Sequence, residues 1–96
     1  MAHYELTPLA QDDLVGLHQY GVRQWGLTQA DTYLSDLFDH FEKIATDPHR
    51  YPTVTDIHPN ARRSVFAPHA VYFEIIDEAI LVLGIIRSQD TGHLSS

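Results

Sequence analysis

Residues 79–90, AILVLGIIRSQD, form an apolar run that ends abruptly in polar side chains. The apolar part, Ala79 to Ile86, predicts a strand that is buried on both faces and is therefore central in a sheet. The segment before it, Ala70 to Ile76, is rich in β-branched and aromatic residues, and Asp77 and Glu78 form the turn between the two. We therefore expect an antiparallel hairpin, which brings the start of its first strand and the end of its second to one end of the sheet.

An amphipathic helix is predicted near the N-terminus, after a short extended segment at Tyr4 to Leu6. Thr7 can cap this helix with its hydroxyl, and Pro8 suits the first helical position, where no N–H is needed. Gly26 provides a C-terminal cap, so the helix is expected to end at Trp25-Gly26. The apolar stripe of this helix comprises Ala10, Leu14, Leu17, Gly21, Val22 and Trp25.

A second helix is expected to start at Thr28, because Thr28 to Asp31 has the pattern of a capping box with Asp in place of Glu. It ends at Asp47-Pro48, since the residue before a proline is disfavoured in the α region. Its stripe shows the clearest helical period in the chain: Ala30, Tyr33, Leu34, Leu37, Phe38, Phe41, Ile44 and Ala45. The two helices are close in sequence, so we expect an antiparallel helical hairpin.

The remaining segments complete an element order of βααβββ. Residues His49 to Ala61 contain several helix and strand breakers and indicate an irregular connection. A strand follows up to Ala67, and Pro68 interrupts it. The predicted class is α+β, with the helical hairpin packed on a small antiparallel sheet. Either the Val71, Phe73 and Ile75 face or the Tyr72 and Ile76 face of the hairpin could receive the apolar stripe of the helices.

Composition limits the function classes. The 96 residues suffice for one small domain, and the absence of cysteine excludes disulfides and thiolate metal ligands. The formal net charge of −7 opposes binding to nucleic acid, which normally requires a basic face. We find no signal-peptide pattern and no membrane-length apolar run, so we expect a soluble cytoplasmic protein.

Metal and nucleophile motifs are not recognisable in the sequence. The seven histidines lack a metal-ligand spacing: His3, His18, His40, His49, His58, His69 and His93. No serine lies in a nucleophile-elbow context. We therefore expect no metal and no cofactor.

The polar ends of the predicted strands form the remaining candidate site: Arg62, Arg63, His69, Tyr72, Arg87, Gln89 and Asp90. Hairpin geometry allows His69 and Arg87 to meet, together with Tyr72. An arginine, a histidine and a tyrosine could stabilise a phosphorane-like transition state and transfer a proton, as in a metal-independent ribonuclease. The structural alternative is an ion pair of Arg87 with Asp90 or Glu74, and we favour it because charged residues at strand ends are common.

The chain resembles the ParE/RelE superfamily of small bacterial toxins from type II toxin–antitoxin modules, and its ParE branch in particular. The resemblance begins at Tyr4 to Leu14 and includes the pattern W-G-x-x-Q-A-x-x-Y from Trp25 to Tyr33. It continues with Ile44-Ala45 before Pro48, with Arg62-Arg63 and with the pattern from His69 to Phe73. In the last strand Arg87 lies near the place where the family commonly has a histidine. Toxins of this kind are often basic, whereas this chain is acidic.

The resemblance implies a single toxin domain over residues 1–96, with 91–96 as a tail, and a hetero-oligomer with a ParD-like antitoxin. It further implies growth arrest, a role in plasmid stabilisation, and inhibition of DNA gyrase through protein contact, without direct nucleic-acid or membrane binding. The residues expected to bind the target or partner are Arg62, Arg63, His69, Tyr72, Arg87, Gln89, Asp90 and Trp25. One alternative is a RelE-like ribosome-dependent mRNA endoribonuclease that would use Arg63, His69, Tyr72 and Arg87. The other is an inactive, toxin-like partner-binding domain.

Overall fold

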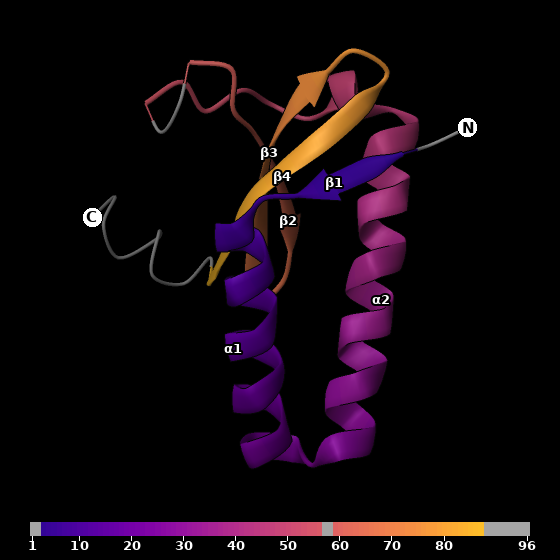
Figure 1. The fold of residues 1–96 in the computed structure, drawn as a ribbon, viewed down its shortest axis with the longest axis vertical. Helices are drawn as coiled ribbons and strands as arrows, with labels where there is room; N and C mark the ends of the chain where they lie inside the picture. Colours follow the sequence, from indigo (N-terminus) through magenta and orange to yellow (C-terminus); the bar gives the residue numbers. More distant parts are fainter. Residues whose placement is uncertain (1–2, 57–58, 88–96) are drawn as a thin grey trace.

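The computed structural model describes residues 3–56 and 59–87. Its elements follow the predicted order βααβββ, with one short 3-10 helix added after the second α-helix. They are β1 (Tyr4–Leu6), α1 (Pro8–Trp25), α2 (Leu27–Thr46), η1 (Pro48–Arg50), β2 (Arg62–Phe66), β3 (His69–Ile76) and β4 (Ala79–Arg87). The α+β class and the helical hairpin are therefore confirmed (Figure 1).

The sheet has the strand order β1-β4-β3-β2, so β4 is an inner strand as its continuous apolar run predicts. Strands β2, β3 and β4 are antiparallel neighbours, whereas β1 pairs with β4 in parallel. The sheet is thus mixed and not wholly antiparallel. Thr7, directly after β1, holds the end of this strand beside β4. Its N–H donates to the Val82 carbonyl at 3.1 Å, and its hydroxyl donates to the Leu83 carbonyl at 3.1 Å.

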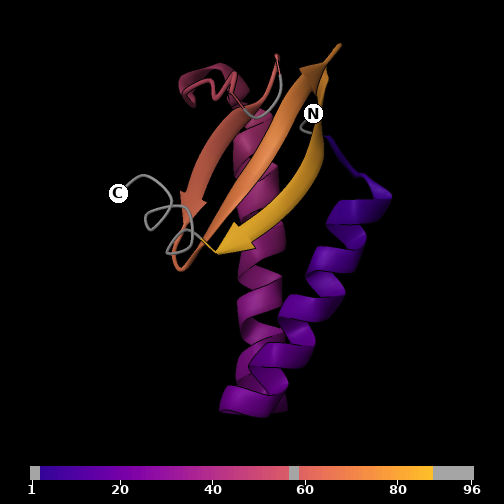
Figure 2. The same cartoon turned by 90° about the vertical axis from the view of Figure 1, so that its left-hand side faces the viewer.

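The helical hairpin covers one face of the sheet and extends beyond its end (Figure 2). Of the two possible inner faces, the one with Val71 and Phe73 packs in the core, with Ile75 at its margin. From the helices, the largest fully buried side chains are Leu37, Phe41 and Ile44. The apolar stripe of α2 therefore faces the sheet as predicted, with Tyr33, Leu34 and Phe38 partly buried along it.

The connection between the helices is a single residue, Gly26. Its N–H donates to the Val22 carbonyl at 3.0 Å, and its own carbonyl accepts from the N–H of Ala30 at 3.1 Å. Gly26 thus ends α1 and begins α2, with φ +92° and ψ 164°, a conformation open essentially to glycine alone.

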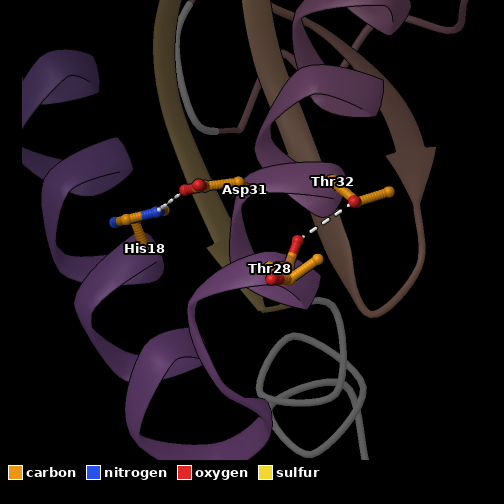
Figure 3. A network of polar contacts seen from close by, with 4 residues as sticks. All are labelled: His18, Thr28, Asp31 and Thr32. Carbon is orange, nitrogen blue, oxygen red and sulfur yellow. Dashed lines mark hydrogen bonds and ion pairs between the residues drawn. The ribbon is translucent and has the colours of Figure 1, made fainter.

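The prediction that α2 starts at a Thr28 capping box is wrong. Helix α2 begins one residue earlier, and Thr28 lies inside it, where its carbonyl accepts a hydrogen bond of 3.0 Å from the Thr32 hydroxyl (Figure 3). The Asp31 carboxylate contacts His18 of α1 instead, with 2.7 Å between His18 Nε2 and Asp31 Oδ1 (Figure 3). A side chain that bridges the two helices has replaced the expected cap.

Candidate functional site

His69 and Arg87 are register partners at the end of the β3–β4 hairpin. This confirms the expectation that the start of one strand and the end of the next meet there. Side chains alternate along a strand, so His69 lies on the same face of β3 as Val71, the face covered by the helices. The pair is therefore located where the sheet end meets the helical hairpin.

Tyr33 of α2 joins this end of the sheet. Its hydroxyl oxygen lies 2.7 Å from Nδ1 of His69 and 3.4 Å from the Phe66 carbonyl oxygen. Burial raises the pKa of Tyr33 to about 12, although the charge of Arg87 opposes the shift. Burial, and then the charge of Arg87, lowers the pKa of His69 below its ordinary value. At neutral pH the two side chains therefore form a neutral hydrogen-bonded pair.

The lowered pKa of His69 predicts a pH-dependent stability. Because the folded protein protonates His69 less readily than the unfolded chain, its contribution is complete above the unfolded pKa of about 6.5 and is lost as the pH falls through the folded pKa. We expect urea denaturation to show a smaller stability loss between about pH 7.5 and about pH 5.5 in His69→Gln than in the unaltered protein. Equal losses in the two proteins would contradict this assignment.

Arg87 contacts an aromatic ring of α1. Its guanidinium carbon lies 5.8 Å from the ring centroid of Tyr20, within the range of a cation–π contact. A groove beside this contact is lined by both carboxylate residues of α1, together with Gly16, Leu17, Tyr20, His69, Ile85 and Arg87. These carboxylates, Asp12 and Asp13, place negative charge in the same groove as the arginine.

Asp13 has a structural role in this groove. Its Oδ2 atom accepts a hydrogen bond of 3.0 Å from the N–H of Ile85, close to an irregularity in the β3–β4 register at Tyr72 and Phe73. A side chain at Gly84 would have its Cβ only 3.2 Å from the same carboxylate oxygen. The absence of a side chain at Gly84 thus lets α1 approach the backbone of β4.

Trp25 lies at the end of α1, near the same end of the sheet. It was expected in the apolar stripe, yet 50% of its surface is exposed. Its ring meets that of Tyr20 edge-to-face, with centroids 6.0 Å apart. A small apolar pocket joins it to His69 through Leu17, Tyr20, Gly21, Ala30, Tyr33 and Pro68. Trp25 and His69 are thus parts of one surface region.

The pattern W-G-x-x-Q-A-x-x-Y has a physical explanation in this arrangement. Gly26 adopts the conformation that the one-residue connection requires, and Ala30 leaves room where the helices approach. A Cβ at Gly21 would lie 3.3 Å from the Cβ of Ala30, which indicates close packing of α1 on α2. Tyr33 reaches His69. The pattern therefore specifies both the one-residue connection of the helical hairpin and the contact of α2 with His69.

Three other predicted site residues lie away from His69 and Arg87. Tyr72 is buried and lies on the opposite face of β3 from His69. Arg62, at the start of β2, donates a hydrogen bond of 2.6 Å from Nη1 to the Tyr51 carbonyl. This bond fixes the irregular connection between α2 and β2 to the sheet. Its neighbour Arg63 pairs with Tyr72 in the register, and its buried Nε has no hydrogen-bond partner in the described part of the chain.

The residues that sequence reasoning missed are Tyr20, Tyr33 and Asp13. Tyr33 was assigned to the apolar stripe of α2, and only its position near the sheet end reveals its polar contact with His69. Tyr20 and Tyr33 both lie in or near the segment that carries the family resemblance, which is the signal that could have identified them. The predicted residues Gln89 and Asp90 lie outside the described residues, as does the tail 91–96.

Within residues 3–56 and 59–87 the structure brings no three His, Asp or Glu side chains together in a way that would hold a metal ion. No helix in these ranges has the length and apolar character needed to cross a bilayer.

Comparison with known proteins agrees with the fold and with the sequence pattern. Residues 4–91 match the family described as ParE toxin of type II toxin–antitoxin system, parDE. Toxin ParE1 of two Mycobacterium tuberculosis strains, CDC 1551 and H37Rv, is 25% identical over 80 residues, covering 83% of this chain and 82% of the relatives. A solved chain described as the chromosomal ParDE system from P. aeruginosa has the same fold, with a TM-score of 0.77, 19% identity, and coverage of 91% of this chain and 96% of that chain. Because the family match spans most of its length, the chain belongs to the ParE toxin family of parDE type II toxin–antitoxin systems.

Proposed function

We propose that this ParE-family toxin acts in the cytoplasm, that a ParD-like antitoxin neutralises it, and that it inhibits DNA gyrase through protein contact. The charge distribution at this end of the sheet supports a protein target and not RNA. Three hollows surround His69, Tyr33 and Trp25: the groove beside Arg87, the small apolar pocket, and a third that is lined by Trp25, Tyr33, Pro68 and residues of α2. Among the described residues, Arg87 is the only lysine or arginine in their lining. Asp12 and Asp13 line the same groove as this arginine.

A RelE-like ribonuclease is the second candidate and fits this charge distribution less well. Such chemistry needs several cationic side chains around the scissile phosphate, and the protein must approach ribosomal RNA. Arg62 donates a hydrogen bond to the main-chain carbonyl of Tyr51. Arg63 lies near the start of β2, whereas the end of β2, at Phe66, is the part that pairs with His69. With a formal net charge of −7, the chain would repel RNA. A poison that acts by protein contact has no such requirement.

The antitoxin is proposed to bind mainly through apolar contacts. The helical hairpin exposes large apolar side chains along its length: Leu9, Val15, Trp25 and Leu27. Strands β1 and β2 are the edge strands of the sheet. Residues 52–54 already pair with the start of β2, so β1 and the far end of β2 are the edges at which an extended peptide could add. A partner that covers these surfaces would form the expected hetero-oligomer.

Expression without an antitoxin is expected to arrest growth and to induce DNA-damage signalling, because inhibited gyrase leaves cleaved DNA. Co-expression of a cognate ParD-like antitoxin should restore growth. The measurement compares colony counts and a DNA-damage reporter with and without induction. Growth arrest without DNA-damage signalling would contradict gyrase as the target, and unaffected growth would favour the inactive, partner-binding alternative.

Arg87→Ala separates the protein-contact mechanism from the ribonuclease. The protein-contact mechanism predicts that the variant folds and cuts no translated mRNA, because the unaltered protein cuts none either. Cleavage mapping of translated mRNA and circular dichroism provide the two measurements. Cutting by the unaltered protein that disappears in a folded Arg87→Ala variant would establish transition-state stabilisation by Arg87 and overturn the proposal.

A further inference from the structure

A shallow groove lies between α2 and the β2–β3 turn, next to the His69 region. Its lining consists of Trp25, Gln29, Thr32, Tyr33, Asp36 and Pro68. The groove thus combines two aromatic rings with one carboxylate. Within the described residues, the Asp36 carboxylate makes no ion pair with another side chain.

The indole of Trp25 is held in place although half of its surface is exposed. Tyr20 packs against it at an interplanar angle of 84°. Because Gly21 has no side chain, the benzene part of the indole lies close to the helix, with Cε3 and Cζ3 each 3.5 Å from the position that a Cβ would occupy. An aromatic side chain fixed in this way offers a preformed surface, and little entropy is lost when a partner binds it.

The chemistry of this groove favours a cation. The face of an indole ring attracts a cationic group, and Asp36 adds a formal negative charge beside it. A guanidinium is planar, stacks on aromatic rings, and donates two parallel hydrogen bonds to a carboxylate, so it matches both features. A phosphate would be repelled by Asp36, and within the described residues the lining contains no cationic side chain.

We propose that this groove binds an arginine side chain of the partner polypeptide, which under the proposed function is the antitoxin. This inference depends on the proposed function in one respect, the identification of the partner as the antitoxin. It reverses the charge relation that is usual for toxins of this kind, in keeping with the net charge of −7 of this chain. The predicted antitoxin segment is therefore apolar in most of its contacts and carries one arginine that inserts beside Trp25.

The test uses the 96-residue chain labelled with ¹⁵N and two small probes. N-acetyl-arginine amide carries the guanidinium, and N-acetyl-citrulline amide is its neutral counterpart, titrated at the same ionic strength. Trp25 is the only tryptophan in the chain, so its indole N–H gives a single, assigned NMR signal. We expect a saturable shift of this signal, with a dissociation constant at least about threefold lower for the arginine probe than for the citrulline probe.

Two charge variants complete the test. Asp36→Asn removes the groove carboxylate, whereas Asp39→Asn makes the same change in net charge one turn further along α2, outside the groove lining. The preference for arginine should fall in Asp36→Asn and persist in Asp39→Asn. Equal binding of the two probes, or equal effects of the two variants, would overturn the proposal. Growth arrest in cells is measured separately, so arrest without arginine binding would refute the groove alone, and arginine binding without arrest would refute the toxin mechanism alone.

Discussion

Phe41→Ala is expected to lower the free energy of unfolding by about 3–5 kcal/mol, the range typical of a large aromatic truncated in a core. Phe41 has no exposed surface and packs at the centre of the core between α2 and the sheet. Its ring meets Tyr4 at a centroid distance of 5.4 Å and Phe38 at 5.8 Å, both edge-to-face. The truncation therefore removes apolar burial and two aromatic contacts, and it leaves a cavity between the layers.

Such a loss is a large part of the stability of a small domain, which is about 5–15 kcal/mol. Urea denaturation followed by circular dichroism measures it, with Leu9→Ala as the control. Leu9 is also an apolar helical residue, but 63% of its surface is exposed, so the control should change stability by less than about 0.5 kcal/mol. Similar losses in both variants would show that Phe41 is not at the centre of the core.

Gly26→Ala is expected to cost about 1–3 kcal/mol through backbone strain alone. The residue has φ +92° and ψ 164°, and its main chain carries the hydrogen bonds that end α1 and begin α2. No other atom lies within 4 Å of the position of an added Cβ, so steric contact with the rest of the protein does not contribute. Relief of the strain would require a change in the angle between the helices.

Gly16→Ala is the matched control for this effect. Gly16 lies within α1, and an added Cβ would likewise meet no atom within 4 Å. Because its backbone is helical, alanine should stabilise the protein by about 0.5–1 kcal/mol. Thermal denaturation should therefore move the two midpoints in opposite directions. A stabilising Gly26→Ala substitution would contradict the strained connection.

Local signals predicted most element ends correctly. Thr7 caps α1, with its side-chain oxygen accepting from the Ala10 N–H at 3.1 Å, and α2 ends at Thr46, directly before Asp47-Pro48. These features depend on side chains only a few residues apart, so the sequence contains them. The start of α2 was predicted wrongly because the tightness of the hairpin and the contact of Asp31 with His18 arise only when the two helices meet.

The sheet shows the same limit. The inner position of β4 follows from its apolar run, but the parallel pairing of β1 depends on contacts across most of the chain. A three-residue strand has too few side chains to specify its neighbour. The exposure of Trp25 was also not predictable, since helical periodicity places it on the apolar stripe and only the extension of the hairpin beyond the sheet leaves it uncovered.

Of the candidate site, only the residues that the β3–β4 hairpin brings together could be predicted from the sequence. Antiparallel pairing brings His69 opposite Arg87, as expected. The contact of Tyr33 with His69 joins α2 to β3 and depends on how the layers pack. The position of Tyr72 depends on which face the helices cover, and the periodicity of the strand allowed both. Arg62 bonds to a main-chain carbonyl, for which a sequence has no signal.

The most direct test of the central claim, that this protein acts on another protein and not on a nucleotide, is a supercoiling assay with purified DNA gyrase. The account predicts that the purified protein inhibits supercoiling and leaves translated mRNA intact in a parallel reaction with ribosomes. Full supercoiling activity together with cleavage of the translated mRNA would contradict it.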